Sequence, residues 1–180
     1  MDFDTAGASR QWLRPSEALQ RFHPPQGVAV SLGIRQIAME IPRFGFRIGQ
    51  IHFLIQTDTL SEVITQTPIY PMPNVPRWFV GVMNLRGNLI PVFDLHHLLE
   101  TGESAQNQTV LVLDRGSDGI GILIDGLPHA VRLGEALHNI PPLHETLQEH
   151  VTTAYTSESG IWLDFDHRDF FTALGWRLAS

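Results

Sequence analysis

Apolar and polar residues alternate along much of this chain with a period of two, which is the spacing of side chains on the two faces of a β-strand. The alternation runs over residues 44–48 and, after a Gly-Gln turn, over residues 51–55, so it predicts a hairpin. Residues 109–113 and 120–124 are two further apolar runs, separated by an Arg-Gly-Ser-Asp-Gly segment at residues 115–119, and they predict a second hairpin. We therefore expect a mainly β protein with only a few short helices.

A third pair of apolar runs, residues 78–83 and 89–93, flanks the stretch Asn84-Leu85-Arg86-Gly87-Asn88. Both runs are rich in β-branched and aromatic residues, so they predict two strands joined by a tight turn. Gly87 suits a turn position with positive φ. Arg86 needs another explanation, because Asn, Asp or Ser would serve equally well at such an apex.

Arg86 and Trp78 are the candidate partner contacts on these strands. The planar guanidinium of an arginine donates several hydrogen bonds while its stem packs on apolar surface, which makes arginine common at interfaces. Trp78 is a candidate second anchor. Each has a plainer alternative, a solvated turn arginine for Arg86 and a core aromatic for Trp78.

Two stretches of the chain repeat one pattern. Residues 89–99 and 161–171 each carry two apolar residues, then Phe-Asp, then three residues and two further apolar ones. The two aspartates, Asp94 and Asp166, are 72 positions apart, and each is expected to cap the turn that follows a strand. We interpret the repeat as two similar small β-subdomains. Short helices are expected at three places: residues 96–99, residues 143–150 and the residues that follow position 166.

Residues 1–43 differ from the rest of the chain and are predicted to be an N-terminal extension, ahead of a domain that spans residues 44–178. Residues 15–22 predict a short helix, because Pro can occupy its first turn and Glu suits its N-terminus. Residues 28–39 fit a helix or a strand equally well. The extension is therefore interpreted as an appended arm.

Composition narrows the classes of function. The chain has 180 residues, of which 43% are hydrophobic and 17% charged, as in a folded domain. Nineteen acidic residues outnumber twelve basic ones, all arginine, so binding to nucleic acid or to an anionic membrane is not expected. The absence of cysteine excludes disulfides and thiolate metal sites. Without a signal peptide or a long apolar stretch, the protein is expected to be cytoplasmic, with no membrane insertion.

The spacing of the ionisable residues argues against catalysis. His144 resembles the start of a zinc-binding helix, but Gln148 stands where the second histidine belongs, and His150 falls on another face. The three aspartates within residues 164–169 lack the spacing of a calcium-binding loop, so a helix cap and a solvated face explain them better. The nine histidines are expected to be solvated surface residues. We expect no metal, no cofactor and no enzymatic activity.

Three closely spaced motifs lie between residues 73 and 95. They are Pro-Asn-x-Pro at residues 73–76, Gly-Val-x-Asn-Leu-Arg-Gly at residues 81–87 and Pro-Val-x-Asp-Leu at residues 91–95. Together they resemble the hallmark of the CheW-like chemotaxis coupling proteins, and the resemblance extends over residues 44 to 174.

This resemblance implies a fold and a role. The fold is the CheW-like one, two small SH3-like β-barrel subdomains packed together, which would account for the repeated pattern. The role is that of a non-catalytic adaptor, which links the cytoplasmic tips of methyl-accepting chemoreceptors to a CheA-type histidine kinase at receptor arrays.

The resemblance also implies partner-binding positions. Arg86 is the first to test, because this turn lies close to the receptor and kinase surfaces in the family. Asn84 and Gly87 would shape the turn, and Glu62 matches an acidic position that faces partners. Three apolar residues match positions near the kinase contact, although each would serve equally well in the core: Ile122, Ile124 and Val131.

Two features depart from the smallest members of the family. The N-terminal extension resembles the branch that serves chemosensory systems controlling type IV pili and twitching, with a flagellar chemotaxis coupling protein as the alternative. Residues 149–155 lack a glycine that often precedes the last hairpin, which leaves the closing edge of the second barrel undefined. Two other classes remain open: a small metal-dependent enzyme, or a stand-alone SH3-like module that binds peptides.

Overall fold

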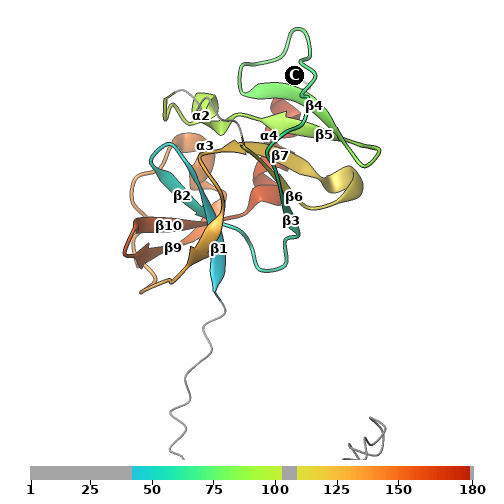
Figure 1. Cartoon of the computed structure of the whole chain (residues 1–180). Helices are drawn as coiled ribbons and strands as arrows, with labels where there is room; N and C mark the ends of the chain where they lie inside the picture. The colour runs from blue at the N-terminus through green and yellow to red at the C-terminus, as the bar shows by residue number, and fades with distance from the viewer. Residues whose placement is uncertain (1–41, 103–108, 179–180) are drawn as a thin grey trace, which may run out of the picture. The chain divides into compact units, whose positions relative to one another are not determined.

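Ten strands form two five-stranded sheets, shown in Figure 1. The structure, a computed structural model, describes residues 42–102 and 109–178, all within the compact unit Ile41–Ser180. The first sheet has the order β8 (His129–Val131), β1 (Arg43–Ile48), β2 (Ile51–Leu54), β10 (Gly160–Phe165) and β9 (Val151–Ser157). The second has the order β3 (Ser61–Ile64), β6 (Thr109–Leu113), β7 (Ile120–Ile124), β5 (Asn88–Phe93) and β4 (Phe79–Leu85). The expectation of a mainly β fold is confirmed.

All three predicted hairpins are present. β1 pairs with β2, β4 with β5 and β6 with β7, each pair antiparallel. The first strand begins at Arg43, one residue before the alternation becomes visible in the sequence. A single 3-10 turn, η1 (Gly116–Asp118), lies in the connection between β6 and β7.

The two sheets have the same strand order. In the first sheet, β2 of the β1–β2 hairpin pairs in parallel with β10, which pairs antiparallel with β9, and the short strand β8 lies at the opposite edge. In the second sheet, β7 of the β6–β7 hairpin pairs in parallel with β5, which pairs antiparallel with β4, and the short strand β3 lies at the opposite edge. The pattern repeated across 72 residues thus corresponds to β5 and β10, which occupy equivalent places in two similar subdomains.

Each sheet curls until the segment after its short edge strand reaches its last strand. In the second sheet, Tyr70 N donates to Val82 O at 2.8 Å and Val82 N donates to Tyr70 O at 3.0 Å. In the first, Gly134 N and Leu137 N each donate at 2.7 Å to carbonyl oxygens of β9. The closing edge left undefined by the missing glycine is therefore paired by residues 134–137. Both sheets close in the manner of small barrels.

The largest apolar cluster is shared by the two sheets. It combines buried residues of the first sheet, such as Phe46 and Phe53, with residues of the second, such as Phe93 and Leu111. Two smaller clusters lie apart from it, one around Met83 and the strands of the second sheet and one around Trp162 in the first. The subdomains therefore share a core, in addition to having apolar interiors of their own.

Three helices follow the strands: α2 (Leu95–Leu98), α3 (Glu145–Gln148) and α4 (His167–Leu178). They lie where short helices were expected. Asp94 Oδ1 accepts from His96 N at 3.0 Å and Asp166 Oδ1 accepts from Asp169 N at 3.1 Å, so both repeated aspartates cap the turn after a strand. The predictions for residues 15–22 and 28–39 lie outside the described residues. No helix in the described ranges is long and apolar enough to cross a membrane.

Candidate functional site

The turn between β4 and β5 has an uncommon backbone conformation at Arg86. Arg86 has a φ of 52° and Gly87 a φ of 89°, the positive pair of values that a two-residue hairpin turn of type I′ requires. Asn84 Oδ1 accepts from Gly87 N at 3.0 Å and so fixes the turn from within. Glycine adopts positive φ freely, but the β-carbon of an arginine makes it unfavourable, and Asn, Asp or Gly is preferred at this position. Arg86 is therefore retained against a local conformational cost.

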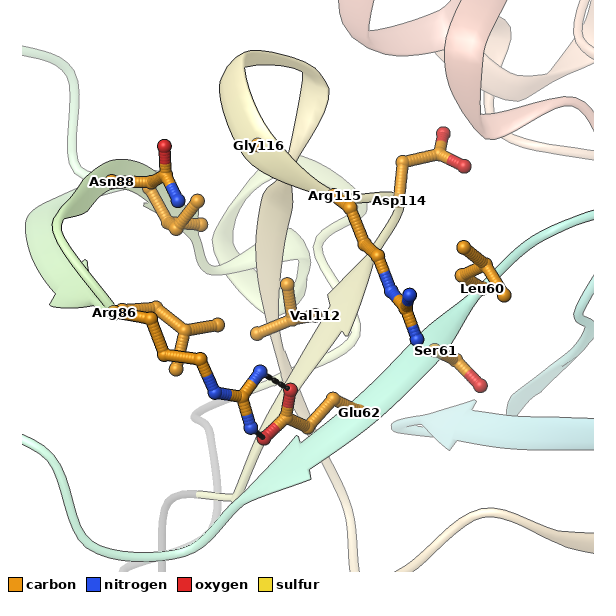
Figure 2. Close-up of a pocket in the computed structure, with 11 residues that line it drawn as sticks. Leu60, Ser61, Glu62, Arg86, Asn88, Val112, Asp114, Arg115 and Gly116 are labelled. Carbon is orange, nitrogen blue, oxygen red and sulfur yellow. Dashed lines mark hydrogen bonds and ion pairs between the residues drawn. The ribbon is translucent and has the colours of Figure 1, made fainter.

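The Arg86 guanidinium is paired with Glu62 on β3. Nη1 donates to Glu62 Oε2 at 2.7 Å and Nη2 donates to Oε1 at 2.6 Å, a bidentate arrangement drawn in Figure 2. Because β3 and β4 are opposite edges of the second sheet, this pair spans the mouth of the closed sheet. The hydrogen bonds to Glu62 raise the pKa of Arg86 further, so the guanidinium stays charged. The two side chains are nevertheless 71% and 37% exposed.

The pair lies at the rim of an open hollow of about 560 Å³. Residues 60–62 form one wall, the β4–β5 turn forms another, and residues 114–116 form the third, as Figure 2 shows. Ile90 and Val112, both buried, lie beneath it. Arg115 extends across the hollow from the third wall toward Ser61. The site is a concave surface with charged walls and an apolar base.

Asp114, on the same wall, is bound on its far side by α4. Arg168 Nε and Nη2 donate to its two carboxylate oxygens at 2.9 and 2.8 Å, and His167 Nε2 lies 3.0 Å from Oδ2. Arg168 Nη1 also donates to Asp58 at 2.9 Å. The hydrogen bond from Arg168 is the main reason that the pKa of Asp114 is lowered, and His167 adds to it, against the opposing effect of partial burial. This network ties the third wall of the hollow to α4.

A second charged cluster lies at α2. The buried His96 ring has Nδ1 2.8 Å from Asp94 Oδ1 and Nε2 3.2 Å from Asp125 Oδ2, and Gly49 N donates to Asp125 Oδ2 at 2.7 Å. His96 and Arg168 are 72 positions apart, the same separation as the two capping aspartates. Each contacts an aspartate that follows the second strand of a central hairpin, Asp125 or Asp58. Sequence reasoning missed both clusters, although His96 and Arg168 lie within the repeated pattern, each two residues after its capping aspartate.

The expectation that the histidines are solvated is wrong for two of them. His96 and His167 are 2% and 1% exposed, and each places one ring nitrogen within hydrogen-bond distance of an aspartate: His96 Nδ1 lies 2.8 Å from Asp94 Oδ1, and His167 Nε2 lies 3.0 Å from Asp114 Oδ2. His144 caps α3 through Nδ1, and His150 Nδ1 lies 2.8 Å from Asp169 Oδ2. Across residues 42–102 and 109–178, no three His, Asp or Glu side chains are arranged to hold a metal ion.

The remaining candidate residues lie at different depths. Trp78 is half-buried, stacks on Phe93 with ring centroids 6.2 Å apart and packs against the shared core. Three other candidates are at most 5% exposed: Ile122, Ile124 and Val131. The structure places these three in the core, the alternative that the sequence had left open, so their side chains are not available for contact. The structure brings Arg86 and Glu62 together at the hollow, with Asn84 and Gly87 in the turn that carries Arg86.

Comparisons with known proteins agree with this architecture. The CheW-like domain family matches residues 43–172. "Protein PilI" of Pseudomonas aeruginosa is 30% identical over 126 residues, covering 67% of this chain and 70% of that protein. "Chemotaxis protein CheW" of Rhizobium meliloti is 31% identical over 84 residues, covering 46% of this chain and only 54% of that protein. The crystal structure of scaffolding protein TtCheW from Thermoanaerobacter tengcongensis superimposes with a TM-score of 0.58 at 17% identity, covering 72% of this chain and 91% of that one. The chain belongs to the CheW-like family.

Proposed function

We propose that this protein is a non-catalytic adaptor that couples chemoreceptors to a CheA-type histidine kinase in a bacterial chemosensory pathway. Family membership supports the proposal, as do the relatives named chemotaxis protein CheW and the structural neighbour described as a scaffolding protein. The single observation that carries it at the level of residues is the bidentate Arg86–Glu62 pair at the rim of an open hollow. An exposed pair contributes little to stability, and strained backbone tends to occur at functional sites, so both features favour a role in recognition.

The pair is suited to meeting a partner because it is already ordered. Two of the five N–H donors of a guanidinium are used by Glu62, so three stay free to donate to a second protein. Holding a long side chain in one conformation before binding reduces the entropy that association would otherwise cost. The turn thus presents Arg86 as a fixed fork beside the apolar base of the hollow.

The pathway that we propose is of the type IV pilus class. Support comes from similarity to PilI over 126 residues and from the N-terminal extension expected ahead of the family domain. "Chemotaxis protein CheW" of Helicobacter pylori, 32% identical over 115 residues, gives similar support to the flagellar alternative. Deleting the gene in the parent bacterium and scoring twitching and swimming separately tests the choice. Loss of swimming with normal twitching would overturn the pilus assignment.

The coupling role is tested by binding. Purified protein should bind a CheA-type kinase and a receptor-tip fragment in calorimetry, and Arg86→Ala should weaken binding by roughly five- to 150-fold. Arg86→Lys should recover part of the loss, because a point charge cannot reproduce a bidentate fork. Arg86→Asn should bind as weakly as alanine while melting no lower than the parent, since Asn tolerates positive φ.

The control is Arg132→Ala, which removes an exposed arginine away from the hollow and should leave binding unchanged. Each of these variants should melt within about 3 °C of the parent, because exposed ion pairs contribute little to stability. If the parent binds neither the kinase nor the receptor tip, the adaptor role is rejected. If Arg86→Ala melts far below the parent, Arg86 braces the fold instead of contacting a partner.

A further inference from the structure

The acidic side chains that line the hollow already have cationic partners. Glu62 is held by Arg86, and Asp114 is held by Arg168 and His167. Arg115 is exposed and, within the described residues, makes no ion pair or side-chain hydrogen bond. The hollow therefore carries one uncompensated charge, and that charge is positive on a chain whose net charge is −7.

The direction of Arg115 is set by its neighbour. Asp114 has a φ of 62°, which reverses the chain after β6. Figure 2 shows the result: the Asp114 carboxylate points away from the hollow, and the Arg115 side chain extends across it. Because Arg168 and the buried His167 hold Asp114, the backbone from which the Arg115 side chain leaves is tied to α4. The Arg115 side chain thus starts from a fixed point in the wall of the hollow, and its guanidinium has no partner among the described residues.

We propose that Arg115 receives a carboxylate from the bound protein partner, and that an apolar side chain next to this carboxylate packs on Leu60 and Leu85. Leu60 is 50% exposed and lines the same hollow, so it offers apolar surface beside the guanidinium. A single carboxylate matches a single free guanidinium. A polyanion such as nucleic acid would meet the Glu62 carboxylate in the facing wall and a chain whose net charge is −7, and both would repel it.

This inference deepens the coupling role proposed above and rests on it. Arg86 and Arg115 then have different tasks: Arg86 is a fork already bound to Glu62, whereas Arg115 supplies the free charge that selects an acidic partner surface. Charge complementarity of this kind acts mainly on specificity and on the rate of association. The affinity that Arg115 contributes should consequently fall as salt concentration rises.

The test compares Arg115→Gln with Arg132→Gln in the full-length protein. Arg132 is a matched control, because it is also exposed and makes no ion pair among the described residues, but it lies outside the hollow. Binding to the kinase and to the receptor-tip fragment is measured separately over a salt series. With one of the two, Arg115→Gln should weaken binding about five- to 50-fold at low salt, and Arg115→Glu should weaken it more. The affinity of Arg115→Gln should also depend less steeply on salt than that of the parent.

Three outcomes decide between the proposals. If the parent binds and Arg115→Gln behaves like Arg132→Gln with both partners, the role of Arg115 is overturned while the coupling function stands. If the parent binds neither partner, the coupling function fails and the inference fails with it. If Arg115→Gln loses binding but also melts several degrees below the parent, Arg115 has a structural role and the inference is overturned.

Discussion

At the scale of single residues, two arginine guanidinium groups and two residues with positive φ organise the candidate site. Arg86 and Asp114 both have positive φ, and both take part in bidentate ion pairs. Aspartate tolerates this conformation better than arginine does, because its short side chain bonds to nearby groups. The backbone conformation at Asp114 therefore has a lower energetic cost than that at Arg86. The contribution of Asp114 to stability comes from the ion pair that its carboxylate makes with Arg168.

We predict that Asp114→Asn lowers stability in a pH-dependent way. Arg168 and His167 lower the pKa of Asp114, so its carboxylate stabilises the fold above the unfolded-state pKa of about 3.9. That stabilisation is lost as the pH falls through the lower pKa of the folded state. Urea unfolding should show a loss of about 1 kcal/mol at pH 7, modest because the pair is partly open to solvent, and the difference from the parent should shrink steadily as the pH falls below about 3.9.

Asp118→Asn is the control for this prediction. Asp118 is exposed, and among the described residues its carboxylate accepts a hydrogen bond only from the neighbouring Ser117 hydroxyl, at 3.3 Å. Its replacement should leave stability nearly unchanged at every pH. A destabilisation by Asp114→Asn that is equally large at pH 7 and pH 3 would contradict a role for the charge.

At the scale of elements, the closure of the second sheet depends on one glycine. Gly81 on β4 has a φ of 147°, and a β-carbon there would overlap the carbonyl oxygen of Tyr70 and lie 2.9 Å from Pro71 Cα. The neighbouring Val82 makes the two backbone hydrogen bonds that hold Tyr70 against β4. Gly81 opens the Gly-Val-x-Asn-Leu-Arg-Gly motif, so the first residue of that motif is explained by backbone contact.

Gly81→Ala should therefore destabilise the protein by about 2 kcal/mol or more, because backbone cannot yield as a flexible side chain can. Equilibrium unfolding in urea measures the change. Gly175→Ala on α4 is the matched control: its β-carbon meets nothing within 4 Å, and alanine favours a helix, so stability should hold or rise. Equal stabilities for the two variants would show that the Tyr70 segment moves aside freely.

At the scale of the whole molecule, the chain passes twice between the sheets. β2 of the first sheet leads into β3 of the second, and β7 of the second leads back into β8 of the first. The first sheet is thus built from two separate segments of the chain, the second from one continuous segment between them, and the two share their largest apolar cluster. We expect the two to unfold together as one cooperative unit.

Deleting residues 1–41 should leave that unit intact. The family domain begins at residue 43, and the described residues have their own core. Arg43 must be kept, because its Nη2 donates to Asp164 Oδ1 at 2.9 Å. Calorimetry should show one cooperative transition within about 3 °C of the full-length protein. A truncated protein that does not fold would show that residues 1–41 complete the core.

The sequence by itself determined the local elements and the family. Alternation with period two located the first hairpin, since it records which side of a strand faces the core. Short apolar runs rich in β-branched and aromatic residues, separated by turn residues, located the other two. Asp94 and Asp166 were recognisable as caps because the hydrogen bonds concerned reach only two or three residues along the chain. The motif that contains Arg86 and Gly87 identified both the turn and the family. Each of these signals is local, because it involves residues only a few positions apart in the chain.

Only the tertiary structure decided which distant residues meet. Glu62 and Arg86 are 24 positions apart, and Asp114 and Arg168 are 54 apart; their pairing depends on how the second sheet curls and on where α4 packs. Burial, too, was decided by the tertiary structure: Ile122 lies in the core, and His96 is buried between Asp94 and Asp125. A sequence pattern specifies the face of an element on which a side chain lies. It does not specify which other surface covers that face, because that depends on the association of strands far apart in the chain.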